Sequence, residues 1–247
     1  AGIVDPKQKL KIEKELGLDQ PLIIQYWKWI SGLAQGDLGY AYVSERPAIE
    51  EIAPRIPVTA KLAVLALIFS VMIGLPLGVI SAVHRNTFLD YLMRVISLSG
   101  LSMPSFWLGL LVLMAFVQAF GWIPIYNRQP DNIWAEIGLL SIPAMVVGFR
   151  SSALIMRLTR SSMLEVLKQD YIRTARAKGL TNRTVVVRHA FRNALIPIAT
   201  IFAFDIGGII GGAVITERVF GWSGMGALFQ NGLDHVDPNP VMAFFLV

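Results

Sequence analysis

The sequence predicts an all-α, polytopic membrane protein, and two observations carry this prediction. Apolar residues make up 54% of the 247 residues, charged residues only 16%, and the mean hydropathy is +0.56. Ordinary globular chains contain about 25% charged residues, so the charged residues here are too few to cover a solvated surface. The second observation is a series of long apolar stretches, several of which reach the roughly 20 residues that a helix needs to cross a bilayer.

Four stretches reach this length, and a fifth begins where the sequence stops. We expect spans at about 58–83, 95–120, 137–156 and 195–216, and the start of a last span at 241–247. Pro76 and Pro104 are expected to kink or interrupt their spans. Because the sequence begins with Ala1 and ends inside an apolar run, we expect further residues at both ends, including an earlier transmembrane helix. A soluble protein with apolar core helices would explain the pattern less well, since core helices this long usually carry charge.

The positions of the basic residues predict the orientation in the membrane. Residues 157–192 contain nine Arg and Lys side chains against only Glu165 and Asp170, and loops of this kind lie on the cytoplasmic side. Residues 84–94 fall on the same side. Residues 121–136 and the segment 1–55 fall outside, and the transmembrane domain is then 56–247. Four aromatic residues flank the outer ends of the spans, as interfacial rings do: Trp122, Tyr126, Trp134 and Trp222.

Two short helices joined by a glycine turn are predicted within the basic segment. Residues 161–178 contain strong helix formers and no Pro, and Gly179 occupies the position of a C-cap glycine. Thr181 or Asn182 can cap a second helix that ends near residue 193. A basic amphipathic loop resting on anionic lipid would explain this pattern. A helix pair that inserts into a groove on a soluble partner would explain it too.

The outer segment is predicted to contain one amphipathic helix. Asp19 is a candidate N-cap with Pro21 in the first turn, and apolar residues recur on one face up to Leu33. Gly36 and Gly39 then mark a loop. The segment is either a small cap that packs on the membrane domain or a docking surface for an external partner.

Two long stretches of the basic segment resemble the signature of ABC-transporter permeases of the peptide type. They are residues 157–180 (RLTRSSMLEVLKQDYIRTARAKGL) and 189–197 (HAFRNALIP). Shorter stretches resemble the first permease of the pair and cover most of the remaining chain: residues 18–21 (LDQP), 25–27 (QYW), 36–39 (GDLG), 101–107 (LSMPSFW) and 211–214 (GGAV). The generic Glu-Ala-Ala of permease loops is replaced by residues 173–175 (RTA), which is the form of the peptide branch.

The resemblance implies an ABC importer type I permease fold, in one permease subunit of an ATP-driven importer in a bacterial or archaeal inner membrane. Its cargo would be a di- or oligopeptide or a related small solute, and the sequence does not distinguish peptides from a nickel chelate or glutathione. The implied partners are a second homologous permease, two ATP-binding subunits, an extracytoplasmic solute-binding protein and membrane lipid, with no nucleic acid.

No enzymatic activity and no cofactor are expected in this chain, and ATP and Mg would be bound by the partner subunits. The chain contains no Gly-x-x-x-x-Gly-Lys-Ser/Thr phosphate loop. It has no cysteine and only three widely spaced His residues, which argues against a metal site. We therefore expect no catalytic and no metal-binding residue.

The resemblance also implies that residues 170–192 form coupling helices, which seat in a cleft on an ATPase subunit. The residues expected to couple are Asp170, Tyr171, Arg173, Thr174, Ala175, Arg176, Lys178, Gly179, Leu180, Arg183, His189 and Arg192.

Asp205, Ser102 and Pro104 are candidates for the translocation path. An Asp in the middle of a span is a functional hypothesis by default, although it can also be structural. Gly207, Gly208, Gly211 and Gly212 form small-xxx-small pairs, which could pack on the chain's own helices or on the second permease. One rival function is an ion-coupled secondary transporter with Asp205 as the proton site, but no inverted repeat is visible. An intramembrane enzyme would need a second catalytic group at depth.

Overall fold

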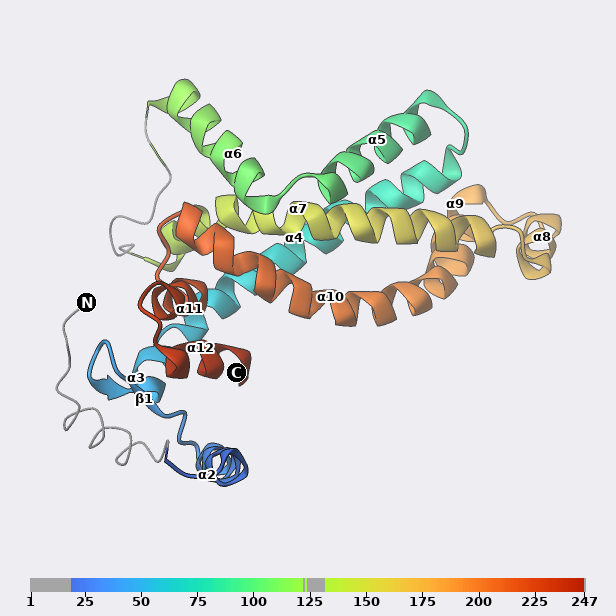
Figure 1. The fold of residues 1–247 in the computed structure, drawn as a ribbon. Coiled ribbons are helices and arrows are strands. Elements are labelled where there is room, and N and C mark those ends of the chain that lie inside the picture. Colours follow the sequence, from blue (N-terminus) through green and yellow to red (C-terminus); the bar gives the residue numbers. More distant parts are fainter. Residues whose placement is uncertain (1–18, 122, 124–131, 247) are drawn as a thin grey trace. The chain divides into compact units, whose positions relative to one another are not determined.

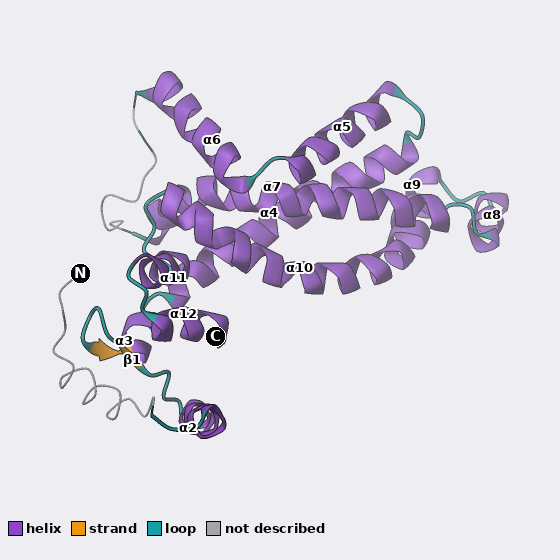
Figure 2. Ribbon diagram, in the orientation of Figure 1, coloured by secondary structure: helices purple, strands orange, loops and turns teal. Residues whose placement is uncertain are grey.

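The structure is a computed structural model that describes residues 19–121, 123 and 132–246. Helices form almost all of its regular elements (Figure 2), which confirms the all-α prediction. The chain divides into two compact units. The larger unit is residues 54–231, and the smaller unit combines residues 1–53 with residues 232–247.

The larger unit consists of the membrane helices and the basic segment (Figure 1). Its elements are α4 (Ile56–Val83), α5 (Phe88–Ser102), α6 (Ser105–Phe120), α7 (Ile133–Val166), α8 (Asp170–Ala177), α9 (Asn182–Thr184), the π-helix η1 (Val185–Phe191), α10 (Arg192–Val219) and the start of α11 (Met225–Asp234). Within the described ranges, the helical runs 56–83, 133–166 and 182–219 are each long and apolar enough to cross a membrane. The predicted spans 58–83, 137–156 and 195–216 lie inside these three runs.

The predicted span 95–120 is not one straight helix. It contains parts of α5 and α6, which pass the test for a span only together and are bent by 108°. The break lies at Met103 and Pro104, whose backbones are extended, with ψ of 127° and 137°. A proline disfavours helical geometry in the residue before it, so the expected interruption at Pro104 is present. Pro76, in contrast, lies inside the continuous helix α4.

Helices α4 and α7 pack along each other closely because small residues of α4 face α7. Gly74, Gly78 and, on α7, Gly148 leave no room for a side chain. A Cβ atom on Gly78 would lie 2.5 Å from the Thr159 Cβ and 2.7 Å from the Met156 carbonyl oxygen. Because these glycines carry no side chain, the two helices can pack closely enough to form one rigid pair, against which α10 and α5 also pack.

Glu217, at the C-terminal end of α10, is a buried acid that the sequence analysis did not single out. Its side chain accepts a hydrogen bond from the Thr59 hydroxyl at 2.5 Å and another from the Gly226 N–H at 2.8 Å. The Thr59 oxygen also accepts a bond from the Met225 N–H at 2.8 Å. One hydroxyl therefore connects α4, α10 and the first residue of α11.

We expect Thr59→Val to destabilise the larger unit by about 1–3 kcal/mol, because it leaves the buried Glu217 oxygen and the Met225 N–H without this partner. The measurement is the unfolding midpoint of the purified protein in detergent. Thr200→Val is the matched control, since Thr200 is exposed and bonds only its own helix, to the Ile196 carbonyl. Equal midpoints for the two variants would contradict a structural role for the Thr59 hydroxyl.

The smaller unit joins segments from both ends of the chain. Its elements are α2 (Leu22–Ala34), β1 (Tyr40–Ala41), β2 (Arg46–Pro47), α3 (Ala48–Ile52) and α12 (Pro238–Leu246). The strands pair antiparallel, with Tyr40 opposite Pro47. The Asn239 amide donates to the Tyr40 carbonyl at 2.7 Å, and the Val43 N–H donates to Asp237 at 3.0 Å. The predicted last span, 241–247, begins within α12, and residue 247 lies outside the described residues.

The expected N-cap of α2 is wrong by two residues. Pro21 is the N-cap, with an extended ψ of 141°, and its carbonyl accepts the first helical hydrogen bonds from Ile24 and Gln25. Asp19 therefore precedes the helix and does not cap it. Gly36 and Gly39 have positive φ values of 83° and 85°, which explains glycine in this loop. Among the residues that the structure describes, none of the apolar side chains of α2 is buried.

Candidate coupling and translocation site

Helix α8 ends in a glycine turn that follows the predicted pattern. Gly179 has φ of +77°, a conformation that favours glycine. Its N–H donates to the Arg176 carbonyl at 2.9 Å, and the Leu180 N–H donates to the Ala175 carbonyl at 3.4 Å. These two bonds form a Schellman motif. Thr181 then caps the next helix by accepting from the Thr184 N–H at 3.4 Å.

The helices on either side of this turn differ from the two short helices that were expected. The predicted first helix, 161–178, is interrupted at residues 167–169, so its first part continues α7 and its second part is α8. The predicted second helix does not stop near residue 193. It continues through α9 and the π-helix η1 into α10, and Pro197 lies within α10. A proline inside a helix removes one backbone hydrogen bond and crowds the carbonyl four residues before it, yet the helix continues past Pro197 here.

Helix α8 is held to the membrane helices by an apolar cluster. On α8 it contains Ile172 and Ala175, which are buried against η1, the end of α7 and the end of α4. The other buried members are Ala82, Met163, Val185, Val186, Ala190 and Ala194. A hydrogen bond from the Asn193 amide to the Tyr171 hydroxyl, at 2.9 Å, adds a polar link between α8 and α10. A force on α8 would therefore reach the ends of α4, α7 and α10 directly.

Most of the predicted coupling residues lie on the surface of this segment. Ala175 is buried and His189 is half-buried, so these two face inward and hold the segment together. The exposed members are Asp170, Tyr171, Arg173, Thr174, Arg176, Lys178, Gly179, Leu180, Arg183 and Arg192. Three apolar side chains of the segment are also exposed, with Tyr171 at 42%, Leu180 at 39% and Val187 at 57%. A basic surface that also exposes apolar side chains is typical of a site for a protein partner.

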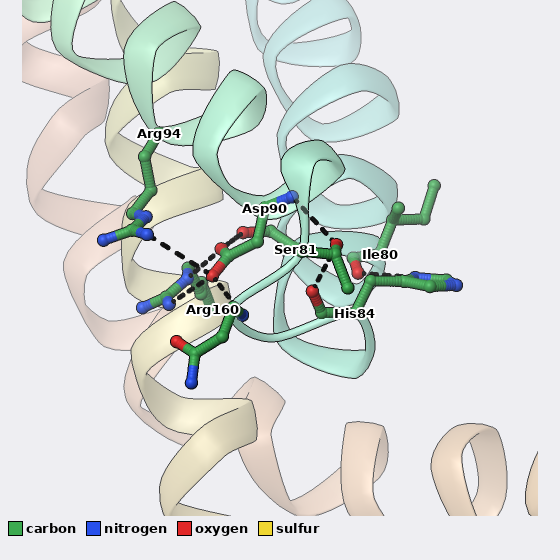
Figure 3. A network of polar contacts seen from close by, with 8 residues as sticks. Ile80, Ser81, His84, Asp90, Arg94 and Arg160 are labelled. Atoms are coloured by element: carbon green, nitrogen blue, oxygen red, sulfur yellow. Dashed lines mark hydrogen bonds and ion pairs between the residues drawn. The ribbon is translucent and has the colours of Figure 1, made fainter.

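A buried ion pair next to this segment was missed by the sequence analysis (Figure 3). Asp90, in the first turn of α5, is fully buried, and its two carboxylate oxygens accept from Arg160 of α7 at 2.7 and 2.9 Å. The Ser81 hydroxyl of α4 and the Asn86 N–H also donate to Asp90, at 2.6 and 3.0 Å. The carboxylate thus joins the ends of α4, α5 and α7 beside the apolar cluster. One sequence signal for it exists: Asp90 follows the N-cap Thr87 by three residues, as in a capping box.

The candidates for the translocation path do not form one site in this chain. Ser102 and Pro104 are exposed and line an open groove at the break between α5 and α6, together with Trp107. Asp205 lies on α10 and is not among the residues that line this groove. Its Oδ2 atom is buried and has no hydrogen-bond partner among the described residues. Gly207 and Gly211 have no atom of the described chain within 4 Å of a built Cβ, so the chain's own helices do not pack on them.

Trp134 is exposed at the start of α7, and Trp222 is buried. The ring of Trp222 therefore belongs to the core of the larger unit, and the position of these rings at the outer membrane interface stays a prediction. Trp122 and Tyr126 lie outside the described residues. Within the ranges that the structure describes, no cluster of three His, Asp or Glu side chains could hold a metal ion.

A bundle of helices long and apolar enough to cross a membrane, with an exposed basic segment, defines a multi-pass membrane protein. Residues 74–247 match the family described as the binding-protein-dependent transport system inner membrane component, and residues 3–63 match its N-terminal family. The chain therefore belongs to this family. It is a multi-pass inner-membrane permease subunit, and its resemblance to the peptide-type ABC permeases is confirmed.

Curated relatives match the chain over nearly its full length. The dipeptide transport system permease protein DppB of Alkalihalophilus pseudofirmus is 37% identical, over 98% of this chain and 79% of its own. The protein of the same name from Escherichia coli K12 is 38% identical, over 95% and 76%. The glutathione transport system permease protein GsiC of Escherichia coli K12 is 38% identical, over 96% and 75%. These relatives do not favour an ion-coupled transporter built on Asp205.

Proposed function

We propose that this chain carries di- or oligopeptides, or a related small solute such as glutathione, across the inner membrane. The relatives that transport dipeptides and glutathione support this range of cargo. The chain would form the translocation path together with a second homologous permease, and an extracytoplasmic solute-binding protein would deliver the cargo. Asp205, Ser102 and Pro104 remain the residues that we propose for the path.

The same proposal makes residues 157–192 the cytoplasmic coupling segment and residues 1–55 extracytoplasmic. The complex would contain two ATP-binding subunits, which bind ATP and Mg, and one of them would receive α8 and the turn at Gly179 in a cleft on its surface. The observation that carries the proposal is this turn: it presents basic and apolar side chains outward, while α8 behind it is packed onto three membrane helices. Movement of the ATPase would then change the packing of α4, α7 and α10 and alternate the access of the path.

Gly179→Arg tests the coupling proposal when it is compared with Gly179→Ala. Gly179 has a positive φ, so both variants impose a similar backbone strain of about 1–2 kcal/mol. No atom of the described chain lies within 4 Å of a Cβ built on Gly179, so the Cβ atom of neither variant clashes with these residues. Only the Arg side chain would fill space that the ATPase occupies. We expect Gly179→Arg to lower the amount of co-purified ATPase about tenfold or more relative to Gly179→Ala.

The measurement is a pull-down in mild detergent from native membranes, with insertion checked by the yield of the permease. Equal retention of the ATPase by the Ala and Arg variants would contradict a cleft at Gly179. Failure of the wild-type protein to retain any ATPase would contradict the coupling role of the whole segment.

A further inference from the structure

We propose that a cavity between α4, α5 and α7, on the side of the bundle that carries the coupling segment, binds the phosphate of an anionic phospholipid. The cavity has a volume of about 380 Å³, within the range of small-ligand sites, about 300–1,000 Å³. Its polar lining includes Arg94, Arg157, Arg160 and Ser161. None of the predicted coupling residues lines this cavity, and it shares only Leu98 with the groove at the α5–α6 break.

The charge of the cavity favours an anion. Asp90 neutralises one of the three guanidinium groups, since it binds Arg160 through both oxygens and lies 3.7 Å from an Arg94 nitrogen. Two positive charges remain. Arg157 is exposed and makes no hydrogen bond or ion pair with any described residue, so its guanidinium is available to a ligand. Arg94 lines the cavity and lies over the Tyr91 ring, 4.2 Å from its centre, and its guanidinium points toward Asp90 (Figure 3).

The apolar part of the lining indicates a lipid rather than a free anion. On α5, Leu98 and Leu101 line the cavity and lie about one and two turns further from the α4–α5 turn than Arg94. Leu98 is 67% exposed and Val95 is 61% exposed, so an apolar surface continues out of the cavity along α5. Charged groups toward the helix ends and apolar groups toward the middle match the two parts of a phospholipid. Basic pockets between membrane helices on the cytoplasmic side bind anionic headgroups in this way.

The lipid would come from the cytoplasmic leaflet of the membrane if residues 157–192 are cytoplasmic, as the proposed function states. Binding of the lipid to the cavity does not depend on that placement. The test therefore uses the full-length subunit, purified with its transport complex and stripped of lipid. Native mass spectrometry would follow the titration of phosphatidylglycerol and, separately, of phosphatidylcholine. Arg157→Gln and Arg94→Gln remove one positive charge each from the cavity. Arg85→Gln is the matched control, because Arg85 is exposed at the α4–α5 turn and does not line the cavity.

We expect the wild-type complex to bind phosphatidylglycerol more tightly than phosphatidylcholine. Each cavity variant should weaken phosphatidylglycerol binding about fivefold, and Arg85→Gln should leave it unchanged. Equal affinity for the two lipids, or an equal loss in Arg85→Gln, would overturn the proposal.

Two further experiments distinguish a bound lipid from a protein and from free phosphate. A photo-crosslinking residue at Leu101, which lines the cavity but not the groove, should label lipid in native membranes, and a cross-link to another subunit would overturn the proposal by placing a protein there. Inorganic phosphate should leave the bound lipid in place. Complete displacement by millimolar phosphate would assign the cavity to the free anion instead.

Discussion

Arg160→Met is expected to destabilise the protein by about 3–5 kcal/mol, because it leaves the carboxylate of Asp90 buried without its main partner. Asp90 is fully buried, whereas the Arg160 side chain is 21% exposed. Removing the acid should therefore cost less than removing the base, since a freed guanidinium can reach water. We expect Asp90→Asn to destabilise by about half as much as Arg160→Met or less.

The double variant Asp90→Asn, Arg160→Met separates this explanation from simple loss of packing. Replacing both members of a buried pair is often close to neutral, so the double variant should be more stable than Arg160→Met alone. The measurement is the unfolding midpoint of the purified complex, treated as a double-mutant cycle. Additive losses from the two single variants would contradict a direct interaction between the side chains.

The same variants test whether the ion pair helps to couple ATP hydrolysis to transport. If the proposed coupling role holds, a complex without this ion pair should transport less cargo for each ATP that its ATPase subunits hydrolyse, because the pair connects α5 to the helices that hold α8. The ratio of uptake to ATP hydrolysis in proteoliposomes measures this, and a merely destabilised protein would lose both activities in proportion.

The apolar stretches predicted where membrane helices lie, but they did not predict where those helices end. The helix that contains residues 137–156 continues to Val166, ten residues past the apolar stretch. Hydropathy detects the part of a helix that contacts lipid, and a helix can extend beyond it into water or against other elements. Arg160 was for this reason assigned to a loop, and its pairing with Asp90 on another helix could not be seen.

Local turn chemistry was predicted more fully than contacts between distant residues. Gly179 and Thr181 act within a few residues of sequence, so their spacing was sufficient to predict the turn and the cap. Glu217 and Thr59 are 158 positions apart, and no spacing rule connects them. The resemblance to peptide-type permeases predicted which residues belong to the coupling segment. Only the structure distinguishes the inward-facing Ala175 from the exposed Arg176.

Gly78→Leu is expected to destabilise the α4–α7 pair by about 3 kcal/mol or more, at the upper end of the effects of overpacking. The short distances from a Cβ on Gly78 to Thr159 and to the Met156 carbonyl oxygen involve the body of α7. A backbone carbonyl cannot move aside as the end of a flexible side chain can, so the helices would have to separate. Gly138→Leu is the matched control, because no atom of the described chain lies within 4 Å of a Cβ on Gly138 of α7.

The consequence for function follows from the position of Gly78. One turn further along α4, Ala82 belongs to the apolar cluster that holds α8. Separation of α4 from α7 at Gly78 would therefore loosen the support of the coupling segment as well as the bundle. We expect Gly78→Leu to lower both the yield of folded protein in membranes and its unfolding midpoint, and Gly138→Leu to lower neither. Normal yield and stability of Gly78→Leu would show that the two helices can separate locally without loss, and the rigid pair could then not carry movement from α8 into the membrane.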